Sequence, residues 1–177
     1  MSRRIFVVSD THRLNAGMIT ALFREAGNFD CVIHLGDIEG EERRIRQEIE
    51  RLNPLSAFLL VRGNCDDDPA VPFFRTVEFE GVKLFLTHGH RYINKVPGGP
   101  FDALASAAYG EGCRAALFGH IHRPVFETAW NGVALLNPGS ISLPRQEDGR
   151  HGYAVLRIED RGSLLWEQKY LEDQIDG

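Results

Sequence analysis

The apolar stretch 5–8 (Ile-Phe-Val-Val), followed closely by Asp10 and His12, constrains the fold more than any other part of the sequence. Four apolar residues, most of them β-branched, are typical of a buried strand in a parallel sheet. A carboxylate and an imidazole follow this strand, two positions apart. Parallel sheets bind ligands at the carboxyl ends of their strands. We therefore expect Asp10 and His12 to begin a metal site at the edge of such a sheet.

The same construction recurs along the chain: an apolar segment is followed each time by side chains that can bind metal. Further strands of this kind are expected at residues 31–35, 55–61, 82–86 and 114–118. The polar groups that follow them are Asp37, Asn64, His88 with His90, and His120 with His122. Amphipathic helices are expected at 16–26 and 39–52. Because a strand, a helix and a return loop fill each of the first two intervals, the first three groups can emerge on one edge of one sheet.

The second half of the chain is predicted to be richer in antiparallel structure. β-Hairpins are expected at 73–86, 125–136 and 153–170, the second around Asn131-Gly132, which is a strong hairpin signal. A loop rich in Gly and Pro at 91–100 precedes a short Ala-rich helix at 101–109, and the last third is expected to be antiparallel. The sequence shows no linker, internal repeat or low-complexity tract, so residues 1–177 are predicted to form a single domain.

Charge and cysteine content narrow the range of functions. The net charge of −5 and the pI near 5.8 argue against a broad basic surface for nucleic acid. Three cysteines without C-x-x-C spacing indicate neither a disulfide framework nor a thiolate zinc site. No apolar run approaches the roughly 20 residues of a membrane span, and the first one is too short for a signal peptide. We expect a cytoplasmic protein without membrane contact.

Each polar group at a strand end has an ordinary explanation when it is taken alone. Asp-x-His is common in loops, and Gly36-Asp37 and Gly63-Asn64 are compatible with turns. Paired imidazoles at 88–90 and 120–122 are more telling, since two histidines around one residue at a strand end rarely lack a role. The joint occurrence decides the matter, because five of the seven histidines fall at strand ends. Carboxylate, amide oxygen and imidazole together suit manganese, iron or zinc.

Five motifs of this chain resemble those of the calcineurin-like metallophosphoesterases, and especially their small YfcE-type phosphodiesterase branch. They are Asp10-Thr11-His12, Gly36-Asp37, Gly63-Asn64-Cys65-Asp66, Thr87-His88-Gly89-His90 and Gly119-His120-Ile121-His122. The resemblance extends from the first strand through Asn137-Pro138-Gly139-Ser140. It implies an α/β fold, a four-layer α/β/β/α sandwich with two mixed central β-sheets. The alternating first half and the hairpin-rich second half are consistent with that architecture.

The resemblance also implies a site for two divalent metal ions, with Mn²⁺ as the first choice and Fe, Ni or Zn as alternatives. The first ion would be held by Asp10, His12, Asp37 and His122, and the second by Asp37, Asn64, His88 and His120. Asp37 would bridge the two ions. A hydroxide shared by the ions would attack phosphorus. The implied function is hydrolysis of a small phosphoester substrate, more specifically a diester.

One position departs from the wider superfamily, whose members often carry a histidine where this chain has Cys65. A thiol is a weaker proton donor and a weaker phosphate partner than imidazolium. We therefore expect substrates with good leaving groups, or proton donation by another residue such as His90. Arg145 is, with Cys65, a candidate substrate contact, although an ordinary surface arginine is the simpler interpretation. His34 is expected to be a core residue or to support the site from behind.

Two alternatives stay open. The small retromer coat subunit has a similar fold but acts as a protein-binding scaffold, with its metal site degraded. All the expected ligand positions are intact in this chain, which favours an enzyme. A metal-dependent nuclease would share the chemistry but would need a long basic groove, which the acidic composition does not supply. The sequence specifies neither the natural substrate nor an oligomeric state.

Overall fold

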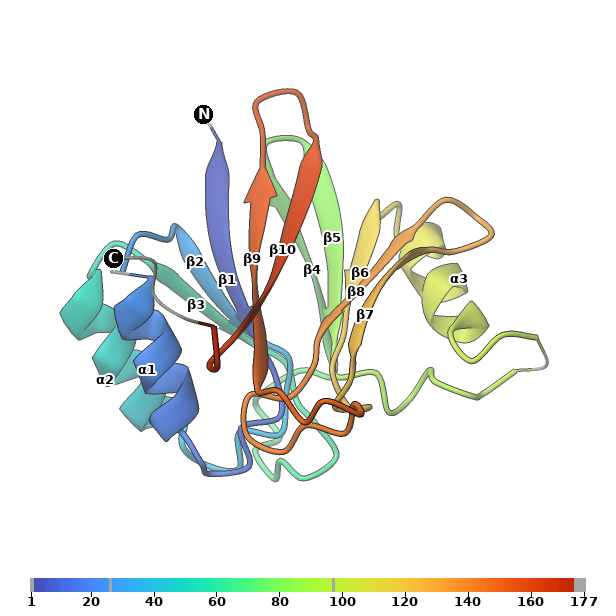
Figure 1. Ribbon diagram of the computed structural model, residues 1–177. Helices are drawn as coiled ribbons and strands as arrows, with labels where there is room; N and C mark the ends of the chain where they lie inside the picture. Colours follow the sequence, from blue (N-terminus) through green and yellow to red (C-terminus); the bar gives the residue numbers. More distant parts are fainter. Residues whose placement is uncertain (1, 26, 97, 174–177) are drawn as a thin grey trace.

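Two five-stranded β-sheets form the centre of the structure, a computed structural model that describes residues 2–25, 27–96 and 98–173 (Figure 1). The first sheet has the strand order β10 (Leu164–Tyr170), β9 (Gly152–Ile158), β1 (Arg3–Val8), β2 (Cys31–His34) and β3 (Ala57–Leu60). The second sheet has the order β4 (Phe74–Phe79), β5 (Val82–Thr87), β6 (Ala115–Leu117), β8 (Ala134–Pro138) and β7 (Pro124–Thr128).

Each sheet contains three neighbouring parallel strands. The other two strands join by antiparallel pairing, β9 and β10 on one side of the first sheet, and β4 and β7 on opposite sides of the second. β1, β2 and β3 are parallel in the first sheet, and β5, β6 and β8 are parallel in the second. The carboxyl ends of three neighbouring strands therefore meet at one edge of each sheet. The prediction of a wholly antiparallel last third was wrong at β8. The β7–β8 hairpin joins the second sheet through β8, which pairs in parallel with β6, and such a long-range pairing leaves no local sequence signal.

Side chains along β1 alternate between two cores. Ile5 and Val7 belong to the core between the two sheets, which also holds residues of β2, β5, β6 and β9. Phe6 and Val8 point the other way, into a core shared with the first two helices. Successive residues of a strand face opposite sides of the sheet. A strand that is buried on both faces therefore requires the uninterrupted apolar run seen in the sequence.

Helices cover the outer faces of both sheets (Figure 1). The first sheet is covered by α1 (Ala16–Arg24) and α2 (Glu42–Leu52), and the second by α3 (Asp102–Gly110). Although α2 is mostly charged, Ile45 and Ile49 lie one turn apart on the same face and are buried. The layers are therefore helices, sheet, sheet and helix, which confirms the predicted four-layer α/β/β/α sandwich.

The main difference in element boundaries concerns α2, which begins at Glu42 instead of the predicted residue 39. Glu39 and Gly40 have φ angles of 53° and 83°, outside the right-handed helical region. They belong to the loop that shapes the site described below. The predicted helix 16–26 ends at Arg24, and its last position, Ala26, lies outside the described residues. Within those residues, no helix is both long and apolar enough to cross a bilayer. The cytoplasmic location stays a prediction.

Candidate metal centre

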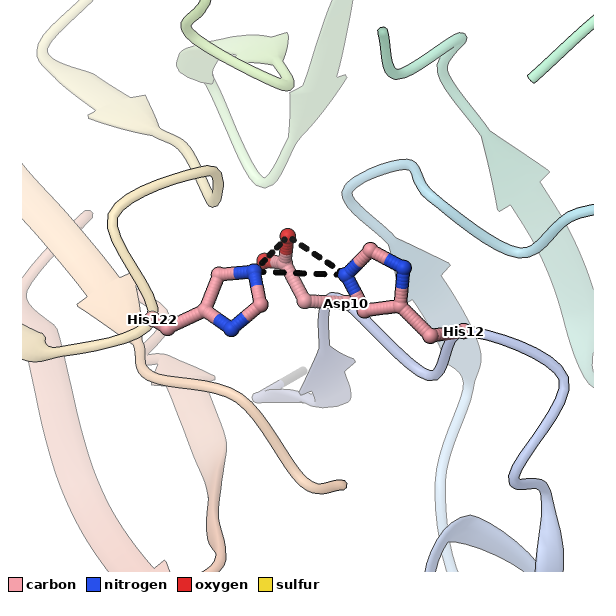
Figure 2. A group of neighbouring side chains, drawn as sticks. All are labelled: Asp10, His12 and His122. Atoms are coloured by element: carbon pink, nitrogen blue, oxygen red, sulfur yellow. Dashed lines mark hydrogen bonds and ion pairs between the residues drawn. The ribbon is translucent and has the colours of Figure 1, made fainter. Parts of the chain in front are cut away.

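Three of the expected ligands meet where β1 and β6 end (Figure 2). Asp10 Oδ1 lies 3.1 Å from His122 Nε2, and the Nε2 atoms of His12 and His122 are 3.2 Å apart. One ligand atom from each of the three side chains lies within 4.8 Å of the others. Asp10 and His12 thus face the same point as His122, which lies 110 positions after His12 in the chain.

Asp37 lies between this group and a second one at the ends of β2, β3 and β5. Its Oδ2 is 3.7 Å from His12 Nε2 and 3.4 Å from His88 Nε2. Asn64 Oδ1 is 3.1 Å from the same nitrogen of His88. Asp37 is therefore within reach of side chains from both sheets, which is the position that a shared carboxylate needs.

His120 lies at the rim of this cluster. Its ring centre is 5.1 Å from that of His88, and its side chain is partly exposed. Its backbone N–H donates to Asp10 Oδ2 at 3.1 Å, so the chain at this position is fixed although the ring stands apart. The structure thus brings six of the seven expected ligands into contact with one another and places the seventh beside them.

The backbone takes a left-handed conformation at five of the expected ligands. These residues have φ between 45° and 70° and are Asp10, His12, Asp37, His120 and His122. Non-glycine residues seldom adopt this conformation, and its concentration at one place is typical of a functional site. The loops also approach closely. A Cβ added at Gly119 would lie 1.9 Å from Ser9 Oγ, and one at Gly63 would lie 2.0 Å from Asp37 Oδ1. The glycines of the motifs therefore let the ligand loops come together.

Hydrogen-bond acceptors fix the orientation of three imidazoles. Nδ1 of His88 and Nδ1 of His122 each lie against a backbone carbonyl oxygen, at 2.8 and 2.6 Å. Nδ1 of His12 lies 2.7 Å from a carboxylate oxygen of Glu39. Because all three partners accept, each ring donates from Nδ1 and turns Nε2 toward the cluster. Histidines that bind metal are commonly held in this way.

The donor set fits a cation. Nδ1 of His122 is held by a backbone carbonyl oxygen, so its Nε2 faces Asp10 Oδ1 at 3.1 Å. Asp10 Oδ1 is buried and has no hydrogen-bond partner in the described part of the chain. A buried oxygen of this kind needs a compensating partner, and a metal ion would supply one. Carboxylate, amide and imidazole ligands together are accepted by Mn, Fe and Zn.

The charges of the cluster keep its carboxylates ionised. Burial by itself raises the pKa of Asp37, but the hydrogen bond and charge of His88 outweigh it and hold the pKa well below its usual value. Burial by itself also raises the pKa of Asp10. His122 and His88 outweigh this effect, so the pKa of Asp10 is lowered as well. Both side chains are therefore charged at neutral pH, which is the form in which carboxylates bind metal.

Cys65, a predicted substrate contact, lies beside Asp37. Its backbone N–H donates to Asp37 Oδ1 at 2.9 Å, and its Sγ accepts from Asn64 Nδ2 at 3.3 Å. Partial burial and then the negative charge of Asp37 raise the pKa of the Cys65 thiol to about 11. The thiol is thus protonated at neutral pH and is neither a nucleophile nor a strong acid.

His90 is a neighbour of His88, with ring centres 5.5 Å apart, and packs edge-on against Phe73. Burial, and then the charges of His88 and His120, lower the pKa of His90 to about 4. A ring that is neutral at neutral pH cannot protonate a leaving group as imidazolium, which counts against the predicted proton donor. It still has one N–H to donate to a phosphoryl oxygen.

Two pockets border the cluster. The smaller one, of about 400 Å³, is lined by His90, His120 and Arg145 among others. The larger one, of about 800 Å³, touches the cluster at Cys65, and its lining includes apolar residues such as Leu60. The structure therefore places Arg145 next to expected ligands, although its side chain is exposed.

Sequence reasoning assigned no role to two polar residues that hold the loops in place. Asp66 accepts hydrogen bonds from the N–H groups of Asp37, Glu39 and Gly63 at 2.7 to 2.8 Å. Ser140 Oγ donates to the carbonyl oxygen of Asp10 at 2.8 Å. Asp66 and Ser140 both lie in motifs quoted above. For Asp66 the only sequence signal is its position directly after Gly-Asn-Cys.

The predicted supporting role of His34 agrees with its surroundings. The ring is fully buried, and its Nε2 lies 3.1 Å from Thr11 Oγ1. Its Nδ1 accepts from the N–H of Gly36 at 3.2 Å. Burial lowers the pKa of His34 to about 4, so the ring stays neutral and links the loops that follow β1 and β2.

A two-sheet sandwich with carboxylates and imidazoles at one edge defines a class of metal-dependent phosphoesterases, and comparison with known proteins agrees. Residues 4–161 match the calcineurin-like phosphoesterase superfamily domain. The chain belongs to that superfamily. The probable metallophosphoesterase YsnB of Bacillus subtilis is 30% identical over 164 residues, which cover 91% of this chain and 88% of the relative. Phosphodiesterase YfcE of Escherichia coli is 33% identical over 105 residues, or 54% of this chain and 51% of that protein.

Solved structures show the same fold. A predicted phosphoesterase from Streptococcus pneumoniae superposes with a TM-score of 0.70 and 26% identity, covering 96% of this chain and 98% of that one. Vps29 from Entamoeba histolytica, solved with zinc, has a TM-score of 0.66 and 20% identity, over 94% and 98% of the two chains. At that identity the second likeness concerns the fold alone.

Proposed function

We propose that the protein is a metal-dependent phosphodiesterase. The observation that carries the proposal is the meeting of Asp10, Asp37 and His88 with Asn64 and His122 at the joint edge of two sheets. Superfamily membership and a relative named as a phosphodiesterase support it. The substrate is a small phosphoester, with diesters preferred to monoesters.

The expected ligands divide into two sets around Asp37. Asp10, His12 and His122 would complete the first with it, and Asn64, His88 and His120 the second. Two divalent ions bound there would polarise the phosphoryl oxygens and activate water for attack on phosphorus. Mn²⁺ is the first choice, with Fe, Ni or Zn as alternatives of similar ligand preference.

The residues around the cluster determine which leaving groups are tolerated. The Cys65 thiol has a pKa of about 11 and is therefore protonated at neutral pH. Burial and the charges of His88 and His120 lower the pKa of His90 to about 4, so its ring is neutral. Neither side chain is a good proton donor near neutral pH. The enzyme should therefore act on esters whose leaving group departs without strong protonation. His90, Cys65 and Arg145 remain candidates to orient the phosphate through hydrogen bonds.

A hydrolysis screen tests this proposal. Chelator-treated protein is reconstituted with Mn²⁺, Ni²⁺ or Zn²⁺ and offered bis(4-nitrophenyl) phosphate, 4-nitrophenyl phosphate, cyclic nucleotides and nucleic acid. We expect turnover of the aryl diester above the aryl monoester, and loss of both in Asp37→Asn. Absence of turnover with every metal and substrate would contradict the proposal and favour the alternative, a protein-binding scaffold of the same fold. Selective turnover of nucleic acid would instead favour the nuclease reading.

A further inference from the structure

The smaller pocket beside the candidate metal centre is strongly cationic. Its lining includes Lys95, Arg123 and Arg145 together with the imidazoles of His90 and His120, and it includes no carboxylate. This runs against the net charge of −5 of the whole chain. Across residues 2–25, 27–96 and 98–173, none of the three cations forms an ion pair. Their charge is therefore available to a ligand.

The three cations come from three different loops, each of which follows a parallel strand of the second sheet. Lys95 lies in the loop after β5, Arg123 directly follows His122 after β6, and Arg145 lies after β8. The backbone N–H of Arg145 donates to the carbonyl oxygen of His122 at 2.9 Å. The residue before Lys95, Asn94, donates its N–H to the carbonyl oxygen of Pro100 at 2.8 Å. The parallel strand ends that carry the ligands thus also bring these charges to one hollow.

The scissile phosphate alone does not account for three further cations. A phosphodiester carries one negative charge, and the proposed metal centre would already face it. The pocket touches that centre at His120 and His90, so a group bound in it would be attached close to the reacting phosphorus. Arginine and lysine without neighbouring carboxylates are suited to a phosphate group. A concave site lined by one sign of charge also concentrates anions.

We propose that this pocket binds a second phosphate of the substrate, next to the scissile phosphodiester. The inference rests on the proposed function, because it takes the scissile phosphate to lie at the cluster. It narrows the substrate class from phosphodiesters in general to small phosphodiesters that carry a further phosphate group.

Titration calorimetry on the Mn²⁺-loaded protein tests the pocket. The probes are thymidine 3′,5′-bisphosphate and, as references, thymidine 5′-monophosphate and 3′-monophosphate. The bisphosphate should bind about tenfold more tightly than either monophosphate. In Lys95→Gln/Arg123→Gln this preference should fall to about threefold or less. The matched control, Arg157→Gln/Arg161→Gln, removes two charges near the amino end of β1, away from the cluster, and should keep the preference.

Equal affinities for the three probes in the wild type, or a preference that survives Lys95→Gln/Arg123→Gln, would overturn the second-phosphate pocket. Calorimetry needs no turnover, so the pocket is tested even if the hydrolysis screen fails. Bis(4-nitrophenyl) phosphate lacks a second anionic group. If the protein hydrolyses it but binds the bisphosphate and the monophosphates equally well, the phosphodiesterase proposal stands and the second-phosphate pocket is rejected. Circular dichroism and metal content of the double variant show whether its fold and metal centre are intact.

Discussion

Asp37 is the residue on which both proposed ion positions depend, whereas Cys65 only borders them. Asp37→Asn should lower hydrolysis by more than the ~100-fold that loss of a ligand's hydrogen-bond partner can cost. Cys65→Ala should cost less than the ~100-fold typical of a proton-transferring residue, because burial and Asp37 raise its thiol pKa to about 11. Steady-state rates with bis(4-nitrophenyl) phosphate, and metal content by mass spectrometry, measure both. Equal losses in the two variants would refute this ranking.

His12 should matter for metal binding and little for folding. Its ring lies between Asp37 and His122 and is partly accessible, so truncation removes a ligand without opening an apolar core. We expect His12→Ala to lower metal content while circular dichroism and the unfolding midpoint of the metal-free protein change little. His151→Ala is the matched control, since that histidine pairs with Glu172 instead of the cluster. Equal loss of metal in both variants would contradict the assignment of His12 as a metal ligand.

At the scale of elements, Glu25 ties the end of α1 to the first sheet. Its carboxylate accepts from Lys169 Nζ on β10 and from Tyr153 on β9, each at 3.0 Å, and pairs with Arg4 on β1. Burial by itself raises the pKa of Glu25, but Lys169, Tyr153 and Arg4 outweigh it and leave the pKa lowered. A carboxyl group with a lowered folded pKa stabilises the fold above its unfolded pKa, and this contribution is lost as pH falls through the folded pKa.

Glu25→Gln should therefore lower the unfolding free energy at pH 7 by about 2 kcal/mol. The difference from the wild type should shrink as pH falls below the unfolded pKa of 4.5, because the wild-type carboxyl then becomes neutral too. Urea unfolding of the two proteins between pH 7 and pH 3 measures it. A difference that stays constant over this range would show that packing, and not charge, is responsible.

Asp66 joins the loop after β2 to the loop after β3. It accepts N–H groups from both loops, including those of Asp37 and Gly63. We expect Asp66→Ala to lower metal affinity by about 10- to 100-fold, as for other residues that orient ligands. Asp67→Ala removes the same charge from an exposed neighbour and should leave metal affinity near that of the wild type. Similar affinities in the two variants would contradict the role of Asp66.

The sequence was sufficient to predict the strands and helices that show a regular apolar pattern, and the motif that recurs at the strand ends. The apolar runs before Asp10, Asp37 and Asn64 identified three strands, of which β1 and β2 are buried and β3 is a partly exposed edge strand. Their spacing placed the strand ends on one sheet edge. It was not sufficient where a long-range contact sets the structure. The helix α2 begins later than predicted because Glu39 belongs to the loop beside His12 and contacts its ring. The strand β8 pairs in parallel with β6, which the local sequence does not indicate. The packing role of Ser140 depends on a contact 130 positions away, which no local pattern records.

For the whole molecule, the candidate metal centre is a joint between the two sheets. Asp10, Asp37 and Asn64 follow strands of the first sheet, and His88 and His122 follow strands of the second. Carboxylates and an amide from the first sheet face imidazoles from the second across this edge, so a cation bound there would hold the two sheets together. A ligand that binds only the folded state stabilises it according to its concentration relative to Kd.

Metal should therefore raise the melting temperature. At a metal concentration about 100 times Kd the stabilisation is roughly 2.7 kcal/mol, which corresponds to a rise of about 5–10 °C for a chain of this size. Calorimetric scans of chelator-treated protein with and without Mn²⁺, Ni²⁺ or Zn²⁺ measure the rise. Asp37→Asn should lose most of it, because the residue shared by both ligand sets is weakened, whereas Cys65→Ala should keep it. A full rise in Asp37→Asn would mean that the stabilising ion binds elsewhere on the molecule.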